Sequence, residues 1–232
     1  DRQIRKTWLQ NNSLVMEILI TSKTHKGKAA CVGGLVLANN RLVRLLNPGN
    51  WDQYADTDFD IGDVWDIQFY NRQDVEPPHI EDIIIQSKQY LRQIDINNHL
   101  LNCGVTIFRG SPNQIFNGRL GWTGNGSGYL GNRENLPTNS VGFWISDRDL
   151  TLDEDGKHYN YHPVNAFTST KRFPYVGFAP KVNIIPQGTL MRISLARWWK
   201  PEGSDLSERC YLQLSGWYGL QNNDNQENNF LD

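Results

Sequence analysis

Short segments in which apolar residues alternate with polar or small ones recur along the whole chain, as strands with one buried face require. In the first part of the chain these segments are residues 16–21, 29–37, 41–46, 61–70 and 80–85. In the second part they are residues 141–146, 159–161, 182–185, 190–199 and 210–218. Many short strands with few helices predict a mainly β protein built from barrels or a sandwich.

Only two segments favour a helix. Residues 87–101 carry apolar side chains at roughly helical spacing and are followed by Gly104 as a C-cap, and residues 112–117 suggest one further short turn. The glycine-rich residues 118–131 predict a flexible loop, and they lack the patterns of a P-loop or a dinucleotide fold. The division that follows is an extension at 1–15, a barrel at 16–87, a helical linker at 88–117, a second barrel at 118–219 and a disordered polar tail at 220–232.

Composition narrows the function classes. A hydrophobic fraction of 38% in 232 residues is enough for a packed core. No run approaches the roughly 20 apolar residues of a membrane span, and no signal peptide is recognisable, so we expect a cytoplasmic protein. The three widely spaced cysteines indicate buried thiols rather than disulfides, and the histidines show no zinc spacing. We expect no metal, no cofactor and no catalytic residue.

The net charge of −2 hides a strong segregation of charge. Residues 16–48 and 168–200 are basic, whereas residues 49–82 hold ten acids and one arginine. Cationic fields attract phosphates, so we predict that the two basic segments share one surface. The alternative is that both basic segments are solvated faces that pair with the acidic one.

Three segments combine cations with aromatic or hydroxyl side chains, which suits phosphate contact and base stacking. They are the basic turn at residues 23–28, residues 167–175 and the predicted hairpin of residues 192–200 and 210–218. Arg41 and Arg44 lie on opposite faces of one strand, and we choose Arg44 for the ligand side. The expected contact residues are Lys23, His25, Lys26, Lys28, Arg44, Lys171, Arg172, Tyr175, Arg192, Arg197 and Trp198.

Trp198 and Trp199 are adjacent, so on a strand they point to opposite faces. The alternation of residues 193–199 predicts Trp199 in the barrel core and Trp198 on the surface. A purely structural role, with tryptophans between core and rim, is the alternative for each ring.

Residues 20–35 (ITSKTHKGKAACVGGL), together with residues 192–200 (RISLARWWK) and 210–218 (CYLQLSGWY), resemble the bacterial family of dual OB domain-containing proteins. The resemblance spans roughly residues 16–219. It implies two OB-like small β-barrels with one or two short helices, and binding of single-stranded nucleic acid or a nucleotide, with a role in bacterial conflict or defence systems. It implies no catalytic residues.

Two other functions remain open. The aromatic surface could bind another protein of the same system, as an adaptor does. An ADP-ribosyltransferase-like enzyme that uses NAD would combine Arg41 or Arg44 with residues 168–170 (TST) and Glu202.

Overall fold

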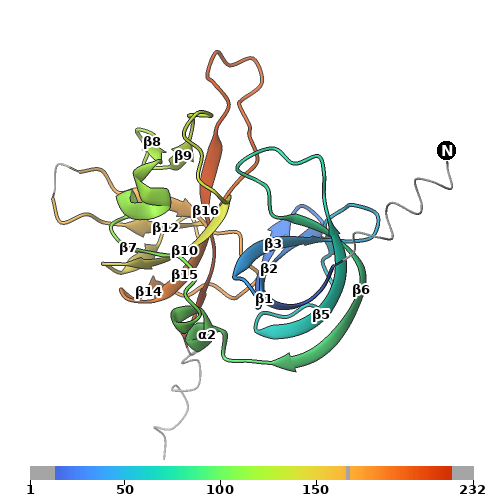
Figure 1. The fold of residues 1–232 in the computed structure, drawn as a ribbon. Helices are drawn as coiled ribbons and strands as arrows, with labels where there is room; N and C mark the ends of the chain where they lie inside the picture. The colour runs from blue at the N-terminus through green and yellow to red at the C-terminus, as the bar shows by residue number, and fades with distance from the viewer. Residues whose placement is uncertain (1–13, 166–167, 221–232) are drawn as a thin grey trace, which may run out of the picture.

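The computed structural model describes residues 14–165 and 168–220, which form two β units lying side by side (Figure 1). The strands of the first unit are β1 (Leu14–Lys26), β2 (Ala29–Val36), β3 (Arg41–Leu46), β4 (Gln53–Tyr54), β5 (Asp63–Asn71) and β6 (Asp82–Gln93). Helix α2 (Ile96–Asn102) connects it to the second unit. The second unit contains β7 (Ile107–Gly110), the 3-10 helix η1 (Pro112–Gly118), β8 (Gly121–Trp122), β9 (Gly128–Leu130), β10 (Val141–Ser146), β11 (Leu150–Leu152), β12 (His158–Tyr161), β13 (Lys171–Pro174), β14 (Ile184–Ile185), β15 (Leu190–Leu195) and β16 (Cys210–Tyr218).

The first unit is a closed five-stranded barrel. Its strands follow the order β1-β2-β3-β6-β5, and β5 pairs back to β1. Only β3 and β6 run parallel, while β4 is a short addition at the edge of β2. Alternate side chains of these strands fill the interior, among them Ile18, Val32, Val43 and Ile67. The expectation of a small β-barrel at this end of the chain is confirmed.

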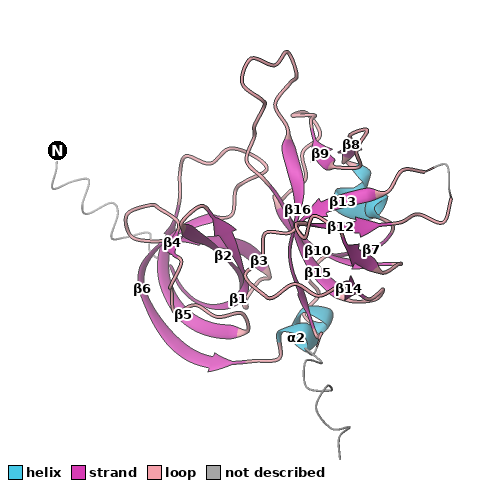
Figure 2. Ribbon diagram, turned by 180° about the vertical axis from the view of Figure 1, so that it is seen from behind, coloured by secondary structure: helices cyan, strands magenta, loops and turns pink. Residues whose placement is uncertain are grey.

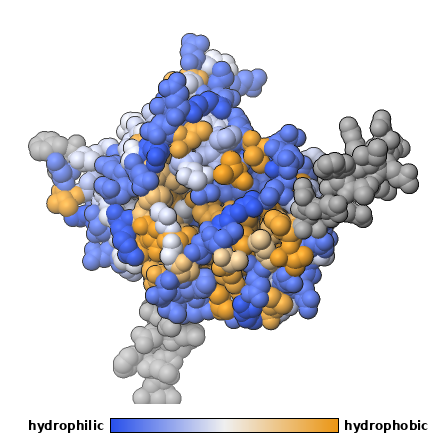
Figure 3. All heavy atoms as spheres, viewed as in Figure 1, coloured by the Kyte–Doolittle hydropathy of each residue, from blue (hydrophilic) through white to orange (hydrophobic). Residues whose placement is uncertain are grey.

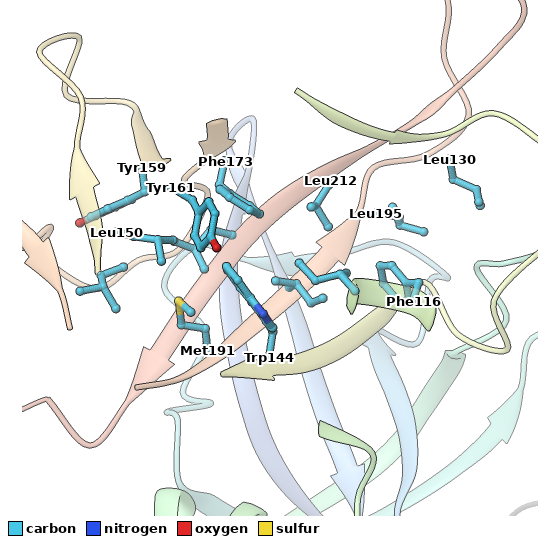
Figure 4. Close-up of a cluster of buried hydrophobic side chains, with 14 of the residues drawn as sticks. Phe116, Leu130, Trp144, Leu150, Tyr159, Tyr161, Phe173, Met191, Leu195 and Leu212 are labelled. Carbon is cyan, nitrogen blue, oxygen red and sulfur yellow. The ribbon is translucent and has the colours of Figure 1, made fainter. Parts of the chain in front are cut away.

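The second unit is a half-barrel made of two sheets. Six strands follow the order β7-β10-β15-β16-β9-β8, and a four-stranded sheet β13-β12-β11-β14 packs against them. Trp144 of β10 stacks on Phe173 of β13 with ring centroids 5.3 Å apart, which joins the two sheets (Figure 4). The mainly β fold class with few short helices is therefore confirmed.

An apolar cluster joins the two units. Leu19 and Leu35 of the first barrel pack with Leu100 of α2 and with Phe143 and Tyr218 of the second unit. The Tyr218 hydroxyl also donates a hydrogen bond of 2.6 Å to the Thr21 carbonyl oxygen, and both groups are buried. Figure 2 shows β16 passing next to the first barrel on the side of the second unit. The barrels thus form one packed body with a shared interface.

The helix predicted at residues 87–101 is wrong over its first half. Residues 87–93 continue β6, which pairs with β5 as far as Gln93, and the helix covers only Ile96–Asn102. Asp95 caps this helix by accepting a hydrogen bond from the Asn98 amide. The end of β6 is exposed and rich in long polar residues, so its composition resembles that of a helix. Pairing with β5 supplies the backbone hydrogen bonds and decides the structure.

Other expectations are met in part. The glycine-rich segment contains β8 and β9, so it is not the loop that we expected throughout. Cys31, Cys103 and Cys210 are free thiols, of which only Cys210 is buried.

Within the described ranges, no helix has the length and apolar character needed to cross a membrane. On the face in Figure 3, hydrophobic residues gather toward the middle and hydrophilic residues surround them. Most of the expected extension and the polar tail lie outside the described residues.

Candidate functional site: a cleft between the barrels

A cavity of about 310 Å³ lies between the two units. The first barrel contributes the end of β1, the inner parts of β2 and β3, and the segment leading into β6. The second unit contributes β15, the residues that follow it, and Gln213 of β16. The polar lining residues that matter for its chemistry are Lys26, Arg44, His79, Glu81, Asp82, Arg192 and Arg197.

Asp82 is the centre of an ion-pair network on the first-barrel wall. Its carboxylate accepts two hydrogen bonds from Arg44, of 2.6 and 2.8 Å, and is only 2% exposed. Arg72 at 3.1 Å and Arg197 of the second unit at 3.0 Å complete the network. Burial opposes ionisation of Asp82, but the bonds and charges of the arginines outweigh it and hold its pKa below the usual range. Asp82 therefore ties the two units together as a carboxylate.

Glu81, next to Asp82, turns toward the second unit. Its carboxylate accepts hydrogen bonds from the Ser140 backbone amide and from the Ser140 hydroxyl, the latter at 3.0 Å. Burial raises the pKa of Glu81, and the bonds to Ser140 together with the charge of Arg192 offset part of this effect. Glu81 and Asp82 thus both serve as links between the barrels.

Arg192 differs from the other arginines of the cleft. Its side chain comes from β15, is 5% exposed and lines the cavity. Its Nε atom has no hydrogen-bond partner among the described residues. Within the same residues, no carboxylate lies within 4.0 Å of its guanidinium nitrogens. Gly33 of β2 provides the room for it, because a Cβ at that position would lie 2.5 Å from Arg192 Nη2. The fold thus holds a buried cation against the cavity without a protein anion bonded to it.

His79 presents a second unsatisfied polar atom. Its Nε2 lies 3.1 Å from the carbonyl oxygens of both Leu195 and Ala196, so Nε2 carries the proton and donates. Burial lowers the pKa of His79, and the nearby charges of Arg197 and Arg44 act in the same direction. Nδ1 of the neutral ring is therefore an acceptor, and it is buried without a partner in the described part of the chain.

The cleft carries an excess of positive charge. Lys26, Arg44, Arg192 and Arg197 line the cavity against Glu81 and Asp82, so four cations face two carboxylates, an excess of two. Lys26 and Arg44 also pair with Asp52, and Arg72 pairs with Asp82. Adding Arg72 and Asp52 gives five cations against three carboxylates, which is the same excess. An anion is the ligand that this field favours.

The structure brings together five of the expected contact residues: His25, Lys26, Arg44, Arg192 and Arg197. The two basic segments meet directly, since Thr24 forms a bridge with Gly177 and His25 stacks on Phe178 with ring centroids 3.8 Å apart. The prediction of a shared basic surface is confirmed for these residues. The alternative of two solvated faces holds only in part. Acids of residues 49–82 pair with cations of both segments, but Arg192 is buried.

The other basic candidates do not line the cleft. The Lys23 ammonium donates to the Thr57 carbonyl oxygen at 2.9 Å, and Lys28 is exposed at the hairpin turn. Lys171 is buried with its ammonium over the Trp122 ring, and burial lowers its pKa. The prediction that Lys171 and Arg172 share the basic surface is wrong.

Arg172 instead pairs with two carboxylates in the second unit. Its guanidinium lies 2.6 Å from Asp153 and 2.9 Å from Asp155, which together with His158 hold potential ligand atoms within 4.8 Å of one another. The guanidinium supplies the positive charge of this cluster. Tyr175 likewise belongs to the second unit, where it stacks on Trp217 and its hydroxyl donates to the Ala179 carbonyl oxygen. Burial raises the pKa of Tyr175.

The prediction for the two adjacent tryptophans is reversed. Trp199 is 55% exposed, whereas Trp198 packs against the core of the second unit. The Trp198 indole donates to the Pro77 carbonyl oxygen at 2.9 Å, and Arg133 lies over its ring. The reason is that β15 ends at Leu195, so strand alternation no longer sets the direction of the following side chains.

Sequence reasoning missed four residues that organise the cleft: His79, Glu81 and Asp82 on the first-barrel side, and Ser140 of the second unit. Glu81 and Asp82 directly precede the apolar run 83–85, and acids at the start of a buried strand are an unusual position for unpaired charges. That signal could have marked them as partners of the basic strand residues.

A family model described as a dual OB-containing domain matches residues 16–217. No curated protein and no solved structure matches the chain.

Proposed function

Because this chain belongs to the dual OB-containing domain family, we propose that it is a binding protein whose ligand is a nucleotide, either free or at the end of a single strand. The cleft between the barrels is the proposed binding site. The expected role in a bacterial conflict system stays a prediction.

The position of the cavity carries the proposal. An OB fold binds its ligand on the face of its second and third strands, between the loops that join strands 1 to 2 and strands 4 to 5. In the first barrel these elements are β2, β3, the turn after Lys26, and the segment between β5 and β6 that holds His79. Cys31, Arg44 and His79 come from them, and all three line the cavity. The cavity therefore occupies the ligand face of the first barrel.

The second unit limits what this face can accept. Arg192, Ala196 and Arg197 close over it and leave about 310 Å³. This volume lies at the small end of the roughly 300–1,000 Å³ range of ligand pockets. An open OB face holds several nucleotides of a strand, about 4–16 per fold. The covered face supports binding of one nucleotide rather than of a continuous strand.

The carboxylates of the cleft support binding rather than catalysis. Asp82 accepts bonds from three arginines, and Glu81 accepts two from Ser140. A general base needs a carboxylate free to receive a proton from the substrate. Of the residues in the NAD-enzyme alternative, Arg44 lines the cavity but Ser169 and Glu202 do not.

A binding experiment with a blocked cleft tests the proposal. Titration calorimetry of the full chain would use mononucleotides, short single-stranded oligonucleotides and duplex DNA, each at two salt concentrations. Ala196→Phe fills the cavity wall, and Ala55→Phe makes the same change on an exposed loop as the control. We expect mononucleotides to bind the wild type and the control but not Ala196→Phe. Equal affinity of all three proteins would remove the cleft from the binding site.

One observation favours the adaptor function as a second candidate. The connection between β15 and β16 projects from the body of the molecule (Figure 1) and carries the exposed side chains of Trp199 and Leu206. Exposed large apolar residues on a projection are typical of protein contact sites. Binding of a protein partner that is lost in Trp199→Ser but unaffected by Ala196→Phe would support this candidate over the first.

A further inference from the structure

We propose that Arg192 is the anchor for a phosphate monoester, so that the ligand of the cleft is a nucleotide with a terminal phosphate. This inference rests on the proposed function and specifies which nucleotides bind.

A buried arginine without a bonded anion is the first observation. Guanidinium groups in protein interiors are normally paired, because removing a charge from water is costly unless a partner compensates. Arg44, Arg72 and Arg197 follow this rule through Asp82. Arg192 is more deeply buried than these three, yet its Nε has no partner in the described residues. A planar fork of donors facing a cavity matches a phosphate or carboxylate group.

The charge of the cavity selects between these anions. Four cationic side chains and two carboxylates line it, so its excess is two positive charges. A phosphate monoester carries about −1.5 to −2 charges at neutral pH, whereas a carboxylate or a phosphodiester carries one. The monoester is therefore the anion that balances the cavity.

The unpaired Nδ1 atom of His79 indicates that the ligand also contains a hydrogen-bond donor. Nδ1 of His79 is a buried acceptor on the wall of the same cavity, and an anion does not satisfy it. A hydroxyl of the ribose or an amino group of the base supplies the donor that it lacks. Inorganic phosphate has no such nucleoside part, so we expect it to bind more weakly than a nucleotide.

Removing the unpaired charge separates a ligand-binding role from a structural one. Arg192→Met keeps the length and apolar stem of the side chain, and it removes a buried cation whose guanidinium nitrogen has no partner. A ligand-binding residue of this kind destabilises the free protein, so the melting temperature of the variant should be equal to or higher than that of the wild type. A residue that supports the fold would give a lower melting temperature.

The experiment is titration calorimetry of the full chain with a nucleoside 5′-monophosphate, its nucleoside, its 3′,5′-cyclic monophosphate and inorganic phosphate. We expect the 5′-monophosphate to bind at least about 10-fold tighter than the nucleoside or the cyclic diester, since a hydrogen-bonded charge is lost in each. In Arg192→Met the affinity for the monophosphate should fall by about 10- to 100-fold and that for the nucleoside should stay unchanged. Arg109→Met, at an exposed position of β7, is the matched control and should behave as the wild type.

A pair of oligonucleotides, with and without a 5′-phosphate, distinguishes a strand end from a free nucleotide. A preference for the phosphorylated strand supports the anchor with a strand end as its source, and binding of mononucleotides alone supports it with a free nucleotide.

Several results would overturn the inference. Equal affinities for monophosphate and nucleoside in the wild type, or wild-type discrimination in Arg192→Met, would reject the anchor while leaving nucleotide binding in place. If no nucleotide or oligonucleotide binds the wild type, the proposed function itself fails. Should Arg192→Met not fold, Arg192→Lys is the second variant. It keeps the charge but loses the fork, and an undiminished ratio of monophosphate to nucleoside affinity in it would also reject the anchor.

Discussion

The two walls of the cleft differ in whether their buried charges are bonded to partners. On the first-barrel wall, the Asp82 carboxylate accepts hydrogen bonds from an arginine of β3, from one that directly follows β5 and from one of the second unit. On the second wall, Arg192 lies equally deep without a bonded anion. The first arrangement has its compensation built in and holds the barrels together. The second has the charge of Glu81 nearby but no anion bonded to it, which is typical of a group arranged for a ligand rather than for stability.

The largest expected effect comes from breaking the compensated wall. Asp82→Asn leaves three guanidinium groups without their carboxylate, and breaking a buried ion pair in this way costs about 3–5 kcal/mol. Urea denaturation at neutral pH should show this loss in the free energy of unfolding. Asp60→Asn, which removes the exposed partner of Lys23, is the control and should cost less than about 1 kcal/mol. A small effect at Asp82 would mean that the network does not hold the barrels together.

Outside the lining of the cleft, Trp198 should stabilise the protein by packing, whereas the Asp82 network stabilises it by charge. Trp198→Ala removes a ring that packs on the core and donates to the Pro77 carbonyl oxygen, so we expect a loss of about 2 kcal/mol, below the value for a fully buried tryptophan. Trp199→Ala, at the exposed neighbour, should change the free energy of unfolding by less than about 1 kcal/mol. Thermal denaturation of both variants measures the difference. The opposite order would restore the orientation predicted from strand alternation.

The smallest effect concerns His79, which lies between the two walls. Because burial and the nearby arginines lower its pKa, the unfolded chain takes up the proton first as the pH falls below the ordinary value of 6.5. The contribution of His79 to stability is therefore complete above pH 6.5 and is lost as the pH falls through its lowered pKa. His79→Gln keeps a donor for the two carbonyl oxygens but cannot titrate.

Urea midpoints at pH 7.5 and 5.5 check this prediction. The wild type should lose more stability between the two values than His79→Gln does, and His162→Gln at an exposed site serves as the control. Identical losses in all three proteins would show that His79 is not held neutral by the cleft.

The sequence allowed the strands to be predicted better than the cleft. Alternation of apolar residues depends on neighbours in the chain, so β2, β3 and β10 were found nearly at their observed bounds. The alternation pattern failed at residues 87–93, where pairing with β5 decides the structure. It also failed after Leu195, where β15 ends. The family resemblance supplied the number of barrels, and the family model confirms it.

The cleft was predicted only as a collection of cations. Arg44, Arg192 and Arg197 were identified from residue type, but their roles depend on which acid lies opposite each of them in the fold. Asp82 contacts Arg197 across 115 positions of the chain, and no local pattern reports such a contact. The same holds for Arg172, whose partners in a nearby hairpin withdraw it from the shared surface.

The hydrogen bond from Tyr218 to Thr21 joins residues 197 positions apart, and it has a consequence for the order of folding. The first barrel contains all of its own strands and can form as soon as β6 has been synthesised, because domains generally fold as units from the N-terminal side. β16 reaches this barrel only after nearly all of the described chain has emerged, and contacts of such long range form slowly. During synthesis the face of the first barrel that lines the cleft is thus open before the second unit closes over it. Completion of the cleft therefore follows the formation of the first barrel.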